Sequence, residues 1–286
     1  MHFPKFWAQA QADARKRDGH GLDLRAWGWS DQTLEDARRM AATRLQNLAA
    51  RVQNGASLTK TSAYGYGGER PLREEIVDSY PGAQDLLACV TRNRYGSLVL
   101  NTATLLFIDV DLPEPASPKN GLFGGLFGRK TPPIDARAEG RAVLRAALER
   151  LGPTSFALYD TAAGFRALAL NRMYAPESSE VAAIMRATGA DPQFAALCKR
   201  QASFRARLTP KPWRMRQRLP PGDFPRDTAA TAAFARWLSG YERAASGFAT
   251  CRFVEQVGAG APLPEFAPLV GLHDEATRAR SMLPLA

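Results

Sequence analysis

The chain has 286 residues, of which 45% are hydrophobic and 23% are charged, and its formal net charge is +10. This composition is typical of a globular protein and differs from that of disordered or collagen-like chains. No apolar run is long enough for a transmembrane helix, and the N-terminus lacks the apolar stretch of a signal peptide, so we expect a cytoplasmic protein.

Histidine and cysteine are too scarce for zinc sites or for histidine-centred catalytic triads. His2, His20 and His273 are the only histidines, and the three cysteines lie far apart with no C-x-x-C pair. Such sites need several of these residues together, so we expect reduced, half-buried thiols instead. The positive charge suggests a polyanionic partner, although it also fits an arginine-rich protein with no such ligand.

Residues 1–96 are expected to form a helical N-terminal extension. From Ser30 to Gly55 the apolar side chains recur at helical spacing, with Ser30 as the expected N-cap and Gly55 as the stop. A second helical stretch is expected from Leu72 to Asp78.

Residues 97–218 are expected to form the core domain. The segment SLVLNTATLLFIDVDLP predicts a strand pair or one long bent strand that ends before Pro113. A helix is expected over 134–152, two strands over 155–170 around a turn from Thr161 to Gly164, and a last strand over 203–209. Two helices are expected over 176–201, the second of them with Asp191 as N-cap and Pro192 at its first position. The order is βαββαβ, so we predict an α+β protein with an RRM-like or ferredoxin-like core between N- and C-terminal helical extensions. The strand order of such a core is usually 4-1-3-2, so the last strand is expected beside the first.

Two further segments lie around this core. Residues 114–133 are dense in Gly and Pro, and residues 120–129 contain the run GLFGGLFG. Its large apolar groups are expected either to contact a partner or a membrane surface, or to belong to a linker. Residues 219–286 are expected to form a C-terminal helical segment with a tail, including a short helix near His273 to Arg280.

A pair of carboxylates ends the first core strand. Asp109 and Asp111 are two apart, so on a strand they project from one face about 7 Å apart. Carboxylates so placed can share one or two Mg²⁺ or Mn²⁺ ions, which clamp a phosphoryl group during transfer. A purely structural role for the same pair is the alternative.

Positive charge is concentrated after the second pair of helices. Eight basic residues and no acidic ones occur in CKRQASFRARLTPKPWRMRQR. Arg205 and Arg207 are expected to point to one face of a strand, where planar guanidiniums suit phosphate. The residues expected to bind a nucleotide or nucleic acid are Arg166, Lys199, Arg200, Arg205, Arg207, Lys211 and Arg214. The alternative is an internal salt-bridge network with no ligand.

This pattern resembles the archaeo-eukaryotic primase or primase-polymerase superfamily, over about Leu98 to Arg214. FIDVDLP matches the family's D-h-D motif, which implies that Asp109 and Asp111 are catalytic metal ligands. DTAAGFRALAL lies where the family has a hairpin with a nucleotide-binding histidine, but Arg166 stands in its place. SFRARLTPKPWR contains no third carboxylate, for which Asp160 is the substitute.

Three functions are compatible with these residues. The first is a primase-polymerase-like protein that binds nucleoside triphosphate or nucleic acid and carries out metal-dependent nucleotidyl transfer. The second is a nucleic-acid-binding module of the same fold without catalysis. The third is an interaction protein in which the acid–base cluster is structural and residues 120–129 capture the partner.

Overall fold

The computed structural model describes residues 1–15, 21–55, 71–82, 86–112 and 136–286. The expectation for residues 120–129 lies outside these ranges. The described chain is a mixed α+β protein with three antiparallel sheets and six α-helices, which confirms the predicted fold class at that level. None of the described helices is long and apolar enough to cross a membrane.

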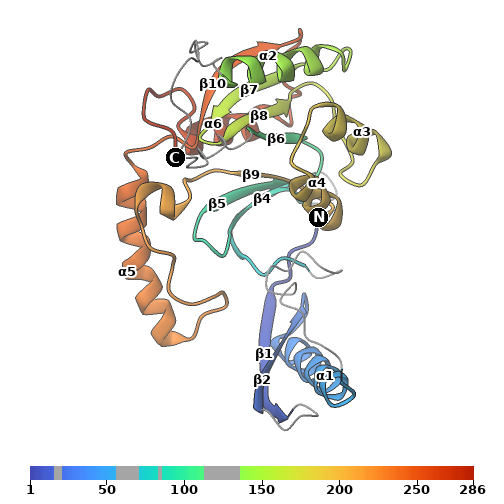
Figure 1. Ribbon diagram of the computed structural model, residues 1–286, viewed down its shortest axis with the longest axis vertical. Coiled ribbons are helices and arrows are strands. Elements are labelled where there is room, and N and C mark those ends of the chain that lie inside the picture. The colour runs from blue at the N-terminus through green and yellow to red at the C-terminus, as the bar shows by residue number, and fades with distance from the viewer. Residues whose placement is uncertain (16–20, 56–70, 83–85, 113–135) are drawn as a thin grey trace, which may run out of the picture.

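The N-terminal unit is a hairpin covered by one helix, and it lies at one end of the molecule (Figure 1). Strands β1 (Phe6–Arg15) and β2 (Gly21–Ser30) pair over their full length, and α1 (Leu34–Gln53) packs on them. A side chain at Gly28 would place a Cβ 2.2 Å from the Ala37 carbonyl oxygen, so glycine permits this close packing. The predicted helix is confirmed, although Thr33 caps it instead of Ser30. The expected helical extension is therefore helical only in part, because β1 and β2 precede α1.

The first four-stranded sheet has the order β3-β4-β5-β9. Its strands are β3 (Glu75–Pro81), β4 (Leu86–Arg92), β5 (Leu98–Thr102) and β9 (Phe204–Arg207). The helix expected from Leu72 to Asp78 is therefore wrong, because that segment runs into an edge strand. The pairing of β4 with β5 also crosses the predicted boundary between residues 96 and 97.

The second four-stranded sheet has the order β10-β7-β8-β6. Its strands are β6 (Phe107–Asp111), β7 (Phe156–Thr161), β8 (Gly164–Ala169) and β10 (Cys251–Val257). The predicted strand and hairpin are confirmed, but the predicted order 4-1-3-2 is wrong. β9 pairs with β5 in the other sheet, and β10, from the predicted C-terminal helical segment, supplies the fourth strand.

Two helices cover opposite faces of this second sheet. On one face Arg141 of α2 (Ala136–Glu149) pairs with Asp160. On the other face His273 of α6 (Ala267–Thr277) stacks on Phe107 and meets Tyr159 edge-on. Side chains alternate along a strand, so neighbouring residues serve the two faces. The other helices are α3 (Ser179–Ala187), α4 (Pro192–Gln201) and α5 (Thr228–Ala245), with a 3₁₀ turn, η2 (Pro212–Met215).

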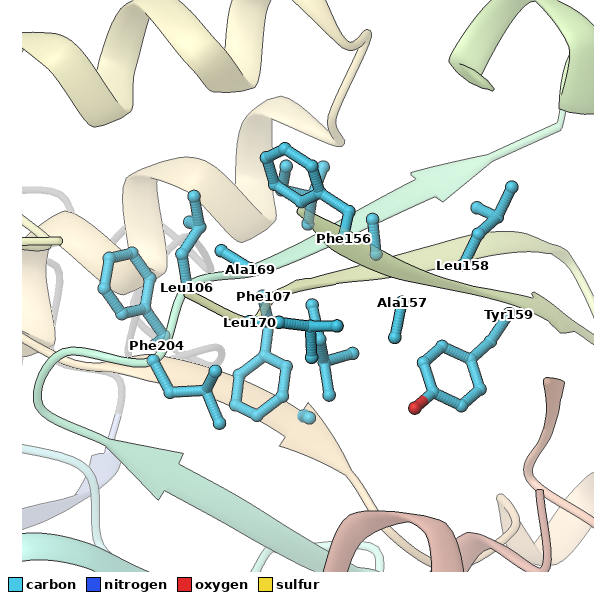
Figure 2. Close-up of a cluster of buried hydrophobic side chains, with 14 of the residues drawn as sticks. Leu106, Phe107, Phe156, Ala157, Leu158, Tyr159, Ala169, Leu170 and Phe204 are labelled. Atoms are coloured by element: carbon cyan, nitrogen blue, oxygen red, sulfur yellow. The ribbon is translucent and has the colours of Figure 1, made fainter. Parts of the chain in front are cut away.

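Both four-stranded sheets contribute to one hydrophobic core. Figure 2 shows part of it, including Leu106 and Phe107 at the start of β6 and Phe204 at the start of β9. These three side chains are fully buried. The shared core therefore holds β9 close to β6 although the two strands do not pair, and the residues that follow β9 lie beside the end of β6.

Candidate functional site

The candidate site is built around an ion pair between two neighbouring strands. Asp109 on β6 lies directly opposite Arg166 on β8. The guanidinium binds the carboxylate with two hydrogen bonds, Nε to Oδ1 at 2.7 Å and Nη2 to Oδ2 at 3.1 Å. Burial alone would lower the pKa of Arg166, but the contacts with Asp109 outweigh it and raise the pKa. Arg166 is thus a permanently charged group in the protein interior.

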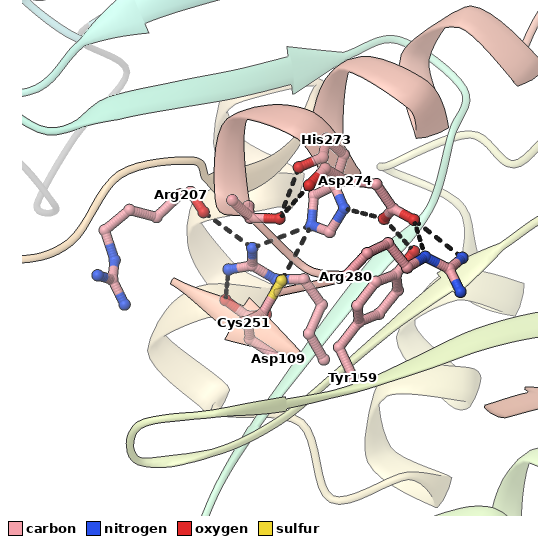
Figure 3. A network of polar contacts seen from close by, with 9 residues as sticks. Asp109, Tyr159, Arg207, Cys251, His273, Asp274 and Arg280 are labelled. Carbon is pink, nitrogen blue, oxygen red and sulfur yellow. Dashed lines mark hydrogen bonds and ion pairs between the residues drawn. The ribbon is translucent and has the colours of Figure 1, made fainter. Parts of the chain in front are cut away.

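Arg166 also joins the two four-stranded sheets. Its Nη1 donates to the backbone carbonyl of Arg207 on β9 at 2.9 Å and lies 3.4 Å from Nε2 of His273 on α6 (Figure 3). The side chain of Arg166 is only 2% exposed. One buried guanidinium therefore fixes the end of β6 against β9 and α6.

A cavity of about 170 Å³ opens beside this ion pair. Its charged residues come from β6, β8, β9, the start of α4 and the 3₁₀ turn. Phe165 and Phe194 contribute apolar wall. The charged lining residues are Asp109, Asp111, Asp191, Arg166, Arg207, Lys211 and Arg214. Of the residues predicted from sequence, the structure thus brings together Asp109, Asp111, Arg166, Arg207, Lys211 and Arg214.

The electrostatics of the cavity favour an anion. Asp109 and Arg166 neutralise each other. Two carboxylates, those of Asp111 and Asp191, then remain in the cavity lining with three cations, those of Arg207, Lys211 and Arg214. Burial and then the neighbouring carboxylates Asp109 and Asp191 raise the pKa of Asp111. Asp111 therefore takes up a proton more readily than a free carboxylate as the pH falls, and the cavity then becomes more positive.

The cations themselves are crowded. Burial, followed by the charges of Arg166 and Arg214, lowers the pKa of Arg207 to about 10. Burial and the charges of Arg207 and Arg214 lower the pKa of Lys211. Within the described ranges, Nη1 of Arg207 is buried and has no hydrogen-bond partner. An anion in the cavity would relieve the mutual repulsion of these cations.

The expected Mg²⁺ or Mn²⁺ site does not fit this geometry. Asp109 uses both carboxylate oxygens on Arg166, and the described residues contain no group of three His, Cys, Asp or Glu placed to hold a metal. The substitute third ligand, Asp160, pairs with Arg141 of α2 on the opposite face of the sheet. The donor set that remains, Asp111 and Asp191, lies among cations.

Three of the predicted phosphate-binding residues lie outside the cavity lining. Arg205 forms a buried ion pair with Glu74 at 2.8 Å, and its Nη2 contacts both carboxylate oxygens. Lys199 and Arg200 lie in the last turn of α4, not among the residues that line the cavity. Within the basic run, Arg205 is thus held by a buried ion pair, whereas Arg207, Lys211 and Arg214 line the cavity.

Sequence reasoning missed Asp191 as a member of the site. It was expected only as the N-cap of α4, which the structure confirms through its hydrogen bond from the Gln193 amide. Its backbone N–H also donates to the Asp109 carbonyl at 3.1 Å, which ties the start of α4 to β6. The Asp-Pro signal marks the start of the helix, but only the fold reveals which strand lies beside it.

A second unexpected group lies behind Arg166. The Sγ of Cys251 is 3.8 Å from Nε2 of His273, and Nδ1 of His273 is 3.2 Å from Oδ1 of Asp274 (Figure 3). This order of groups resembles a catalytic triad. Cys251 and His273 are nonetheless completely buried, so a substrate does not reach them. The group acts as packing behind Arg166, and all three cysteines are free and buried, as reduced thiols.

Comparisons with known proteins add no family to these observations. No protein-family model, no curated protein and no solved structure matches the chain.

Proposed function

We propose that this protein binds a phosphate-bearing ligand, a nucleotide or a nucleic acid, in the cavity beside Asp109, without requiring a metal ion. The observation that carries the proposal is the convergence of Arg207, Lys211 and Arg214 on one cavity, where Nη1 of Arg207 is buried and has no hydrogen-bond partner among the described residues. Guanidinium and ammonium groups that converge on one small volume are the usual means of holding a phosphate.

This proposal corresponds to the second of the three functions considered from sequence. Nucleotidyl transfer needs carboxylates free to hold metal, whereas both oxygens of Asp109 are bound by Arg166. The net charge of +10 adds long-range attraction for a polyanion, which favours a nucleic acid or nucleotide over an uncharged ligand.

Binding of a fluorescent single-stranded oligonucleotide and of a nucleoside triphosphate, each with and without Mn²⁺, tests the proposal. Lys211→Gln with Arg214→Gln removes two cavity charges. Lys5→Gln with Arg236→Gln is the matched control, since both of those side chains are exposed and do not line the cavity. We expect the cavity variant to weaken binding strongly and the control to change it little.

The salt and metal dependences complete the test. The logarithm of the affinity should fall by about 0.7 to 0.9 per phosphate contact for each decade of salt, with a smaller slope in the cavity variant. Binding that requires Mn²⁺ and is lost in Asp111→Asn would replace this proposal with the metal-dependent one. Absence of binding under all conditions would leave the acids and bases as a structural network.

A further inference from the structure

We infer that the ligand is a single-stranded nucleic acid, one base of which stacks on the indole of Trp213 while an adjacent phosphate occupies the cavity. This inference rests on the proposed function, and it identifies the ligand more closely. It comes from the position of one exposed aromatic side chain relative to the cations that line the cavity.

Trp213 lies between two of the cavity's basic residues. Lys211 and Arg214 both line the cavity, and Trp213 is in the 3₁₀ turn that connects them. Its side chain is 48% exposed, which is unusual for the largest apolar residue. An exposed aromatic ring next to phosphate-binding cations is the arrangement with which proteins hold single strands, by stacking and charge together.

The ring is also held in place before any ligand binds. Tyr95 packs edge-on against Trp213, with the ring centroids 5.1 Å apart, and Nζ of Lys211 lies 5.4 Å from the indole centroid. Pro212 and Met215 of the same turn are buried, which anchors the turn to the body of the protein. A fixed ring binds a base at a lower entropic cost than a mobile one.

The size of the cavity explains why a base would lie outside it. Its volume of about 170 Å³ is below the roughly 300 to 1,000 Å³ of pockets that enclose whole organic ligands. A phosphate group fits in such a volume, whereas a complete nucleotide needs more room. The base attached to that phosphate must therefore lie outside the cavity, and the exposed ring of Trp213, next to Arg214 and two residues after Lys211, is the aromatic surface available to it.

A single strand suits this arrangement better than a duplex. In a duplex both faces of each base are covered by neighbouring base pairs, so a protein meets only the base edges and the backbone. Stacking on Trp213 needs an uncovered base face. Stacking is also tolerant of sequence, because every base has such a face.

The test compares Trp213→Ala and Trp213→Phe with Val143→Ala, a control at an exposed apolar residue on α2. The probes are a fluorescent 12-residue thymidine strand, a strand of equal length made of abasic spacers, and a duplex. Inorganic pyrophosphate serves as a competitor that reports on the cavity alone. Anisotropy titrations measure all affinities.

We expect Trp213→Ala to weaken binding of the thymidine strand by about 5- to 150-fold, the range measured for loss of one stacked base. Trp213→Phe should retain most of the affinity of the unaltered protein. The abasic strand, the duplex and competition by pyrophosphate should be unaffected by either Trp213 variant, and Val143→Ala should change nothing.

Two results would overturn the inference while leaving the proposed function intact. Unchanged binding of the thymidine strand by Trp213→Ala would place the base elsewhere, and an equal loss for thymidine and abasic strands would give Trp213 a structural role only. By contrast, failure of pyrophosphate to compete for the unaltered protein would contradict the phosphate cavity itself.

Discussion

Asp109 and Asp111 differ in their surroundings, and their substitution by asparagine should shift stability in opposite directions. Asp109→Asn leaves the guanidinium of Arg166, whose side chain is 2% exposed, without a counter-charge. Breaking a buried ion pair from one side costs about 3 to 5 kcal/mol, and we take the lower end because the Asp109 side chain is 30% exposed. Asp111→Asn instead removes a carboxylate that Asp109 and Asp191 repel, so stability should rise by up to about 0.5 kcal/mol.

Urea unfolding followed by circular dichroism measures both effects. With a denaturant slope of about 2 kcal/mol per molar, Asp109→Asn should lower the midpoint by about 1.5 M. Asp109→Asn combined with Arg166→Met should recover much of the loss, since no orphaned charge then remains. Equal destabilisation by Asp109→Asn and Asp111→Asn, as expected of two equivalent metal ligands, would refute the reasoning.

Three other predictions follow from the same structure. Burial and the neighbouring acids raise the pKa of Asp111 above 3.8. A single-stranded oligonucleotide without a terminal phosphate should therefore bind more tightly as the pH falls through that raised pKa. Binding titrations at several pH values should show no such trend for Asp111→Asn. Gly164→Ala would place a Cβ 2.0 Å from a backbone carbonyl oxygen of β6 and should cost about 3 kcal/mol in thermal melts, whereas Gly21→Ala, which meets nothing, should cost less than about 0.5 kcal/mol. Burial raises the pKa of Cys89 to about 11 and that of Cys198 to about 12, so alkylation followed by mass spectrometry should detect their reaction only at the rate of unfolding.

Local patterns in the sequence predicted most of the elements in the second half of the chain. Asp191-Pro192 correctly marked the start of α4, and the turn from Thr161 to Gly164 correctly separated β7 from β8. These signals are local, since a cap or a tight turn depends on a few adjacent residues. The partner of each strand is not a local property, and the error in placing β9 beside β6 arose there.

The N-terminal strands were missed for a related reason. β1 alternates alanine with glutamine and other polar residues, which favours helix by propensity, yet it forms ten residues of sheet. Its pairing with β2 and its packing against α1 decide the conformation. In the site, the D-x-D spacing correctly put Asp109 and Asp111 at one cavity, but Arg166, a residue 57 positions from Asp109, determines what Asp109 can bind.

The contact of Arg166 with the Arg207 carbonyl places the cavity at the junction of two separately hydrogen-bonded sheets. One wall comes from β6 and β8 and the other from the end of β9 and the turn after it. A ligand that bridges these walls opposes their separation, so it should raise the unfolding temperature of both sheets together. The free energy of unfolding rises by RT ln(1 + [L]/Kd), where [L] is the free ligand concentration, which is about 2.7 kcal/mol when [L] is a hundred times Kd. A thermal-shift screen of phosphate compounds therefore detects ligands of the folded protein with no assumption about a reaction.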